Sequence, residues 1–359
     1  MPCFHPLKAF VIGKQDNGKN NLKICSYEVD HVELDSNGCL IPSSIAYVSD
    51  RARRVYREFI EIPCGQCIGC RIDYSRQWAN RCLMELQYHE SSYFVTLTYD
   101  DVHVPISYYA NNEDGEAYPS QTLCKRDLQL FFKRLRYNTG QDLRYFCCGE
   151  YGSKSARPHY HCIIFGLVLD DLVPYKRSHE GFQYYNSETV QKAWRGFAHN
   201  FEGDEIPGTY GDLGFAVVAD VTWESCAYTA RYVTKKATGY EKQFYDTFNL
   251  QPEFALMSRK PGIARQFYED HKGELYEYDH ISIKTSKGGR KVRPPRYFDQ
   301  LFDIDDPDTM FEIKEKRKAF MEEFNKMRLS RTSKGYLEML ASEEANFKDR
   351  IKGLQRSEI

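Results

Sequence analysis

The segment RPHYHCIIFG, residues 157–166, places two histidines one residue apart, directly after a proline and ahead of a hydrophobic run. The run is short and rich in aromatic and β-branched residues, which predicts a β-strand. Side chains alternate between the two faces of a strand, so His159 and His161 share one face, roughly 7 Å apart, and Tyr160 lies on the other. Two imidazoles at this spacing can bind one metal ion. The alternative is a pair of strand histidines with ordinary hydrogen bonds.

A third metal ligand is expected from the preceding strand. Residues 143–151 predict a strand, and GSKSARP, residues 152–158, predicts the turn that joins both strands into an antiparallel hairpin. Glu150 ends the first strand and His159 begins the second, so the two residues lie across from each other. Glu150, His159 and His161 therefore form a candidate site for one divalent ion, with positions left open for water or substrate.

The segment CAYTARYVTKK, residues 226–236, carries a pair of tyrosines on a helix expected from Trp223, with Thr222 as its N-cap and Gly239 as its stop. Tyr228 and Tyr232 are four residues apart, so they share a face of this helix. Tyrosine is seldom a nucleophile because its phenol titrates near pH ~10. It suits attack on a phosphodiester when a metal ion withdraws charge from the phosphate and a lysine stabilises the developing negative charge. The alternative is packing on the apolar face of the helix.

Three thiols fall within the segment PCGQCIGC, and they belong to Cys64, Cys67 and Cys70. Thiolates at this spacing suit tetrahedral zinc, and a fourth ligand has to come from elsewhere in the chain. Cys3 and His5 are candidates; Cys82 is a poorer one because it lies on the apolar stripe of a helix expected over residues 73–89. We place Cys3 in the fourth position of a structural zinc site. Buried free thiols are the alternative.

The composition is that of a globular protein with room for one large or two smaller domains, with 359 residues, 42% hydrophobic and 28% charged. No apolar run approaches the length of a membrane span, and the first residues, MPCFHPLKAF, lack the core of a signal peptide. We therefore expect no membrane association and an intracellular location. The 12 cysteines are then expected to be reduced and used for packing or metal binding.

The formal net charge of −2 argues against nucleic-acid binding only as a sum, because the basic residues are segregated. Residues 280–296 contain six lysines and arginines and no acid, and residues 120–136 contain five against one aspartate. Local basic surfaces of this kind bind phosphate groups, although a solvated surface without a partner is the alternative. The candidate DNA-binding residues are Lys284, Lys287, Arg290, Lys291, Arg293, Lys133 and Arg134.

The remaining pattern mixes strands and helices. Further strands are expected over 93–101 and 214–222, and a helix after residue 123 with an apolar stripe formed by Leu128, Phe131 or Phe132, and Leu135. Residues 103–120 are expected to be a polar loop, and residues 170–212 a loop-rich insertion with one short helix near 187–197. Apolar stripes in two C-terminal helices are formed by Phe320, Phe324 and Met327, and by Leu340, Phe347, Ile351 and Leu354.

This order, with its hairpin, predicts an α+β fold around a central antiparallel β-sheet flanked by helices. Three regions are expected along the chain. Residues 1–90 form an N-terminal region with the cysteine cluster, residues 91–250 form the core, and residues 251–359 form a basic hairpin and C-terminal helices.

The chain resembles the HUH endonucleases, the metal-dependent nickases that start rolling-circle replication. It is more similar still to the replication initiator proteins of small circular single-stranded DNA phages, the microviruses, and especially of their gokushovirus branch. The resemblance extends to about residue 298. It is carried by FVTLTYDD (94–101), GEYG…RPHYHCIIFG (149–166) and YTARYVTKK (228–236), with PCGQCIGC (63–70) and SRKPGI (258–263) in support.

The resemblance implies an HUH endonuclease-like fold in which His159 and His161 bind Mg²⁺ or Mn²⁺. Glu150 is our placement of the third ligand. The residue between the two histidines is usually aliphatic in that family, and here it is Tyr160. Because its side chain points away from the metal, we expect no loss of function.

The resemblance further implies that Tyr228 or Tyr232 attacks the origin phosphodiester, leaving a 5′-phosphotyrosine and a free 3′-OH for the host polymerase. The other tyrosine would resolve the finished circle by strand transfer. Lys235 lies seven residues after the first tyrosine and three after the second, so it shares their face and is expected to contact the phosphate. Lys236 is the second candidate.

The expected partners are single-stranded and origin DNA and the host replication machinery, in the cytoplasm of the bacterial host cell. Two other functions remain open. A non-catalytic zinc-containing nucleic-acid-binding protein would leave the tyrosine pair without a task. A metal-dependent hydrolase that uses water as its nucleophile would tolerate the loss of both tyrosines.

Overall fold

The computed structural model describes residues 3–15, 20–111, 114–152, 155–177, 181, 183–200, 203–232, 240–285 and 288–352. The chain forms two compact units. The first combines the residues up to Asp73 with those from Lys314 onward, and the second runs from Tyr74 to Ile313. The region boundaries expected near residues 90 and 250 both fall inside the second unit.

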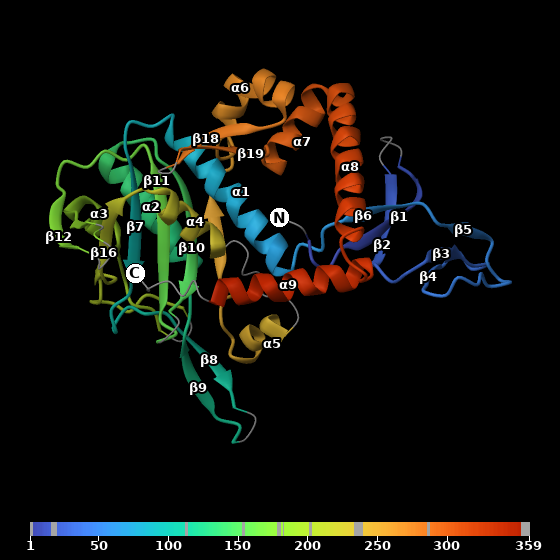
Figure 1. Ribbon diagram of the computed structural model, residues 1–359. Coiled ribbons are helices and arrows are strands. Elements are labelled where there is room, and N and C mark those ends of the chain that lie inside the picture. The colour runs from blue at the N-terminus through green and yellow to red at the C-terminus, as the bar shows by residue number, and fades with distance from the viewer. Residues whose placement is uncertain are drawn as a thin grey trace. The chain divides into compact units, whose positions relative to one another are not determined.

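The second unit is built on a seven-stranded sheet with the strand order β12-β13-β16-β7-β11-β10-β17 (Figure 1). All neighbouring strands in it are antiparallel. The strands are β7 (Ser92–Thr98), β10 (Arg144–Tyr151), β11 (Pro158–Phe165), β12 (Val173–Arg177), β13 (Gln183–Asn186), β16 (Ala216–Asp220) and β17 (Phe254–Met257).

Helices cover both faces of this sheet, because side chains alternate along each strand and both sets are apolar. Tyr160, Cys162 and Ile164 of β11 pack into one core with buried residues of α2 (Lys125–Thr139) and α3 (Glu188–Ala193). Ile163 and Phe165 pack into the other core with residues of α1 (Ile68–Leu86) and α4 (Trp223–Tyr232). The predicted α+β fold, a central antiparallel sheet flanked by helices, is confirmed.

Two segments that were expected to lack strands contain them: the prediction of a polar loop over 103–120 was wrong, and that of a loop-rich insertion over 170–212 was wrong in part, since its short helix is confirmed by α3. β8 (Ile106–Ala110) and β9 (Ala117–Gln121) form a hairpin, and β12 and β13 extend the main sheet. All five residues of β12 are exposed, and β9 contains Pro119. Such strands lack the alternation of apolar and polar residues from which a strand is predicted.

Two helix ends matter for the site. α4 begins at Trp223 as predicted, and Thr222 is its N-cap, because its Oγ1 accepts a hydrogen bond of 3.1 Å from the backbone N–H of Ser225. The expected continuation of this helix and its stop at Gly239 lie outside the described residues. α1 begins at Ile68 instead of near residue 73, so it includes Cys70.

Towards its C-terminal end the second unit contains the helices α6 (Arg265–Tyr278) and α7 (Arg296–Asp305) and, between them, the basic hairpin of β18 (Ile281–Thr285) and β19 (Gly288–Val292). Its remaining elements are β14 (Arg195–Gly196), β15 (Gly211–Asp212) and α5 (Tyr240–Thr247). No helix among the described residues is long and apolar enough to span a membrane.

The first unit contains two three-stranded sheets with the orders β2-β1-β6 and β4-β3-β5. Its strands are β1 (Leu7–Lys14), β2 (Asn20–Ser26), β3 (His31–Leu34), β4 (Leu40–Ser43), β5 (Arg54–Tyr56) and β6 (Phe59–Ile62). The C-terminal part of the chain adds α8 (Pro307–Leu329), which starts in the second unit, and α9 (Tyr336–Lys352). Leu340 of α9 is buried and Phe347 contacts the ring of Phe4. By contrast, Phe320, Phe324 and Met327 of α8 remain exposed.

His31 is buried between two carboxylates of the first unit. Its Nδ1 lies 3.0 Å from Asp30 Oδ2 and its Nε2 lies 2.9 Å from Glu33 Oε1. The hydrogen bond with Glu33, and then that with Asp30, raises the pKa of His31. The resulting stabilisation is complete below the unfolded pKa of ~6.5 and is lost as the pH rises through the folded pKa. We expect His31→Gln to lower the melting temperature more at about pH 6 than at about pH 9, and an equal loss at both would contradict this.

Candidate metal and tyrosine site

The β10–β11 hairpin assembles the three predicted ligands of the catalytic ion. Glu150 pairs with His159 in register, and His161 lies two residues further along the same face. Glu150 Oε1 lies 2.8 Å from Nε2 of His159 and 2.8 Å from Nε2 of His161. The ligand atoms of all three residues lie within 4.8 Å of one another, close enough to hold one metal ion.

The other ring nitrogens of the two histidines have partners of their own. Nδ1 of His159 lies 3.1 Å from the carbonyl oxygen of Arg157, and Nδ1 of His161 lies 3.0 Å from Oγ1 of Thr96. A carbonyl only accepts, so Nδ1 of His159 carries a proton, and Nε2 faces the Glu150 carboxylate. Partners of this kind fix the orientation of histidine ligands. Thr96 lies opposite His161 in β7 and was not predicted.

Two polar atoms at this site fit a bound cation. Glu150 Oε2 and His161 Nε2 are buried and have no hydrogen-bond partner among the described residues. Nε2 of His161 is close to Glu150 Oε1, but the contact is not aligned as a hydrogen bond. Buried polar groups normally have partners, and a divalent cation would satisfy both an oxygen and an imidazole nitrogen.

The charges at the site are coupled. Burial acts to raise the pKa of Glu150, but the close imidazoles of His159 and His161 outweigh it and lower the pKa to about 2. Burial acts to lower the pKa of His159, but Glu150 outweighs it and the pKa is raised. Burial lowers the pKa of His161 in spite of the same carboxylate. A carboxylate kept ionised and a histidine kept neutral are the forms that bind metal ions.

Tyr228 lies directly at this group. Its hydroxyl donates a hydrogen bond of 2.9 Å to Glu150 Oε1. Its ring meets that of His161 edge to face, with the centroids 4.9 Å apart, while Phe94 stacks against the same imidazole with the centroids 5.4 Å apart. α4 therefore brings the tyrosine hydroxyl to the atom shared by both histidines.

The predicted DNA-binding residues differ in their exposure and in their contacts. Lys133 is exposed on α2, whereas Arg134 donates from Nε to the carbonyl oxygen of Ala193 at 2.9 Å, which ties it to α3. Arg290 and Lys291 of β19 are exposed, as is Arg293, which follows this strand. The residues Lys235, Lys236 and Lys287, and the side chains of Tyr232 and Lys284, lie outside what the structure describes.

Two acidic residues outside the three-ligand group, Asp100 and Glu253, have different roles. Asp100, in the motif TYDD, accepts hydrogen bonds from the backbone N–H groups of Val102 and His103, so it holds a turn. Glu253, which was not predicted, accepts a hydrogen bond of 3.4 Å from the N–H of Tyr151, and its charge contributes to the raised pKa of His159.

The cysteine cluster belongs to the first unit. The sulfur atoms of Cys3, Cys64, Cys67 and Cys70 lie within 4.8 Å of one another, a set that can hold a metal ion. The sulfur of Cys64 receives backbone N–H groups from Gln66 at 3.4 Å and Cys67 at 3.3 Å. A hydrogen bond from Cys70 lowers the pKa of Cys3 to about 5. Four sulfur ligands in this arrangement are typical of tetrahedral structural sites.

The structure distinguishes the three candidates for the fourth position of the cluster. Cys3 Sγ lies 3.6 Å from Cys64 Sγ and 3.9 Å from Cys67 Sγ. The ring of His5 instead lies 2.9 Å from Glu344 Oε2. Cys82 is fully buried in the core beside the main sheet. Only Cys3 of the three joins the cluster.

The known proteins that are similar to this chain are all replication-associated proteins. The family described as replication-associated protein ORF2/G2P matches residues 92–237, which include β7, the hairpin and α4. Replication-associated protein ORF2 of Spiroplasma virus 4 is 32% identical over 298 residues, covering 82% of this chain and 85% of the relative. Replication-associated protein VP4 of Bdellovibrio phage phiMH2K is 28% identical, covering 79% and 80%. Replication-associated protein ORF4 of Chlamydia phage 1 is 27% identical, covering 54% and 43%.

No solved structure matches the chain. The relatives confirm the resemblance to the replication proteins of gokushovirus-type microviruses that was inferred from the motifs. The extent of the match to the Spiroplasma virus protein places the chain in their family. This chain belongs to the family of replication-associated proteins of gokushovirus-type microviruses.

Proposed function

We propose that this protein initiates rolling-circle replication by nicking the DNA origin with Tyr228 as the nucleophile. The observation that carries the proposal is the hydrogen bond from the Tyr228 hydroxyl to Glu150, the residue that also faces both histidines. A tyrosine that served only to pack the helix would not need its hydroxyl at a candidate metal site. This placement favours the nickase over a binding module, in which the tyrosine has no task.

In the proposed step, the Tyr228 hydroxyl gives up its proton to solvent, and its oxygen attacks the phosphorus of the origin phosphodiester. The bond from phosphorus to the 3′ oxygen breaks, and that oxygen takes up a proton to become the free 3′-OH, while the 5′-phosphate remains esterified to the tyrosine. A divalent ion, Mg²⁺ or Mn²⁺, held by Glu150, His159 and His161, would withdraw charge from the phosphate. Glu150 also orients the phenol through its hydrogen bond.

Strand transfer would complete the cycle. Tyr232 attacks the regenerated origin junction, and the 3′-OH released there attacks the phosphotyrosine at Tyr228, which closes the circle and frees the first tyrosine. Lys235 and Lys236 are assigned to the phosphate, and the basic hairpin to the DNA backbone. The partners would be single-stranded and origin DNA and the host replication machinery, in the cytoplasm of the bacterial host.

A denaturing gel tests the proposal with single-stranded DNA that contains the origin and is labelled at its 3′ end, in the presence of Mn²⁺ or of EDTA. We expect the label to migrate with the denatured protein only when Mn²⁺ is present. Cleavage without attachment would indicate water as the nucleophile and a metal-dependent hydrolase. Binding without cleavage would indicate a non-catalytic nucleic-acid-binding protein.

The cysteine cluster is proposed to bind structural zinc. We expect the purified protein to contain about one zinc ion per chain by elemental analysis. Cys64→Ser should remove this zinc and lower the melting temperature by several degrees, because a structural metal contributes to the stability of the fold. Cys39→Ser is the matched control, since Cys39 is an exposed free thiol of the same unit. A Cys64→Ser protein that retains its zinc and its melting temperature would contradict this role.

A further inference from the structure

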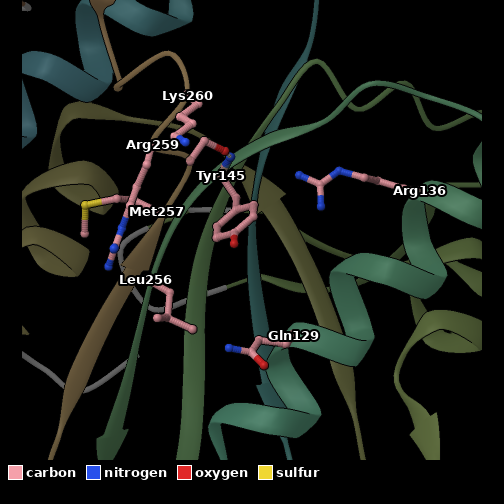
Figure 2. A pocket seen from close by; sticks show the side chains of 8 residues that line it. Gln129, Arg136, Tyr145, Leu256, Met257, Arg259 and Lys260 are labelled. Carbon is pink, nitrogen blue, oxygen red and sulfur yellow. Dashed lines mark hydrogen bonds between the residues drawn. The ribbon is translucent and has the colours of Figure 1, made fainter.

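A second cationic feature lies away from the metal site. An open cleft of about 500 Å³ is bounded by α2, the start of β10, and β17 with the segment that follows it. Figure 2 shows Arg136 and Arg259 on either side of Tyr145 in this cleft, with Lys260 nearby. The lining residues are Gln129, Arg136, Tyr145, Leu256, Met257, Ser258, Arg259 and Lys260.

The segment SRKPGI, residues 258–263, is anchored on both sides of its two cations. The N–H of Ser258 donates to the carbonyl oxygen of Tyr145 at 2.9 Å, and Ser258 Oγ accepts from the N–H of Tyr145 at 3.1 Å. At the other end, Arg144 donates to the carbonyl oxygens of Pro261 and Gly262 at 3.0 and 3.1 Å. Arg259 and Lys260, both exposed, are therefore presented by a fixed backbone.

Buried groups hold the end of this segment in place. Arg81 donates from Nε and a terminal nitrogen to the carbonyl oxygen of Ile263, at 3.2 and 2.9 Å. A Cβ on Gly262 would lie 2.6 Å from the hydroxyl of Tyr297, so a side chain there would require Tyr297 to move. Hydrogen bonds from a buried arginine fix this surface turn, and such support favours a binding role for Arg259 and Lys260, which the turn presents.

The floor of the cleft is rigid as well. The ring of Tyr145 stacks on Phe132 with the centroids 3.9 Å apart, and the guanidinium of Arg136 lies 5.5 Å from the centre of the Tyr145 ring. Burial raises the pKa of Tyr145, whereas the nearby charges of Arg136 and Arg259 act in the opposite direction. Both guanidinium groups are therefore close to the same ring.

The charges of the cleft have one sign. No aspartate or glutamate is among its lining residues. Within the described part of the chain, Arg136, Arg259 and Lys260 form no ion pair with a carboxylate. Three unneutralised cations around a concave surface, beside the hydroxyl of Tyr145 and the amide of Gln129, offer donors suited to phosphate oxygens.

We propose that this cleft binds backbone phosphates of a DNA strand at a point separate from the nicked phosphodiester. Tyr145 and Glu150 are five residues apart on β10, so they face opposite sides of the sheet, roughly 17 Å apart along the strand. A strand held in the cleft would pass the β17 edge of the sheet to reach the metal site. The inference rests on the proposed function for its choice of ligand, because DNA is the substrate there.

The test measures DNA binding by the full chain in EDTA, so that no cleavage is required. The fluorescence anisotropy of labelled oligothymidylate is recorded over a range of salt concentrations for the wild type and for the double variant Arg259→Ala/Lys260→Ala. We expect binding to weaken at least about tenfold at ~0.1 M salt. We also expect the plot of log K against log salt to become shallower by about 1.4, at about 0.7 for each phosphate that the variant no longer neutralises. Oligoadenylate should show the same weakening, because phosphate contacts carry no sequence information.

The matched control is Lys176→Ala/Arg177→Ala, which removes two exposed cations from β12 at the opposite edge of the same sheet. The control should keep the wild-type salt dependence, and both variants should keep the wild-type melting temperature. An unchanged slope for the cleft variant would overturn the inference.

The two proposals fail separately. A wild-type protein that never attaches to DNA, but whose salt dependence becomes shallower in the cleft variant, would reject the nickase and keep the cleft. A wild-type protein that attaches to DNA, but whose salt dependence the cleft variant does not change, would reject only the cleft.

Discussion

Tyr228→Phe is expected to reduce covalent attachment of the protein to single-stranded origin DNA by at least ~10³-fold in the presence of Mn²⁺. The substitution removes the oxygen that is proposed to form the first phosphoester bond and leaves the ring contact with His161 in place. It also removes the hydrogen bond to Glu150, which the two histidines still surround. The measurement is the fraction of labelled DNA that migrates with the denatured protein.

Tyr88→Phe is the matched control for Tyr228→Phe. The Tyr88 hydroxyl also donates to a carboxylate, Asp270 Oδ2, at 2.8 Å, but that carboxylate belongs to α6 and not to the candidate site. The control should attach to DNA as the wild type does. Tyr232→Phe, made in parallel, separates the two tyrosines of the motif. If Tyr228→Phe attached normally and Tyr232→Phe did not, the assignment of the first nucleophile would be wrong.

Glu150→Gln is expected to weaken Mn²⁺ binding at least ~100-fold and to abolish attachment to DNA. The amide has nearly the shape of the carboxylate but no negative charge, so it is a poor ligand for a divalent ion. The substitution also removes the charge that keeps the pKa of His159 raised, which changes the protonation of a second ligand. Isothermal titration calorimetry of the purified protein with Mn²⁺ measures the affinity directly.

Glu253→Gln provides the control for this experiment. It removes a neighbouring negative charge that acts on His159 but is not one of the three grouped ligands. We expect its Mn²⁺ affinity to remain within about tenfold of the wild type, because only the surrounding charge changes. Equal losses from both substitutions would show that the ion is bound by general negative charge and not by the Glu150 carboxylate.

The central part of the site could be predicted because it depends on local patterns. The alternation of side chains placed His159 and His161 on one face, and the short turn between two strands placed Glu150 opposite His159. The start of α4 followed from the capping residue Thr222.

The residues that were missed come from strands that are distant in the sequence. Thr96 reaches His161 because β7 pairs with β11, and Glu253 reaches Tyr151 because β17 follows β10 at the sheet edge. The order and register of strands that are not consecutive depend on tertiary packing and leave no local signal. For the same reason, the sequence could offer Cys3 and His5 only as alternatives, whereas the fold brings Cys3 to Cys64.

The most direct test of tyrosine nicking is to identify the residue that carries the DNA. After reaction with Mn²⁺ and digestion of the DNA by nuclease, trypsin will cut after Arg231, which lies between the two tyrosines and places them in separate peptides. Mass spectrometry then locates the remaining nucleotide. We predict that a nucleotide remains linked through its 5′-phosphate to the peptide that ends at Arg231 and contains Tyr228. Cleaved DNA with no nucleotide on either tyrosine peptide would contradict the account.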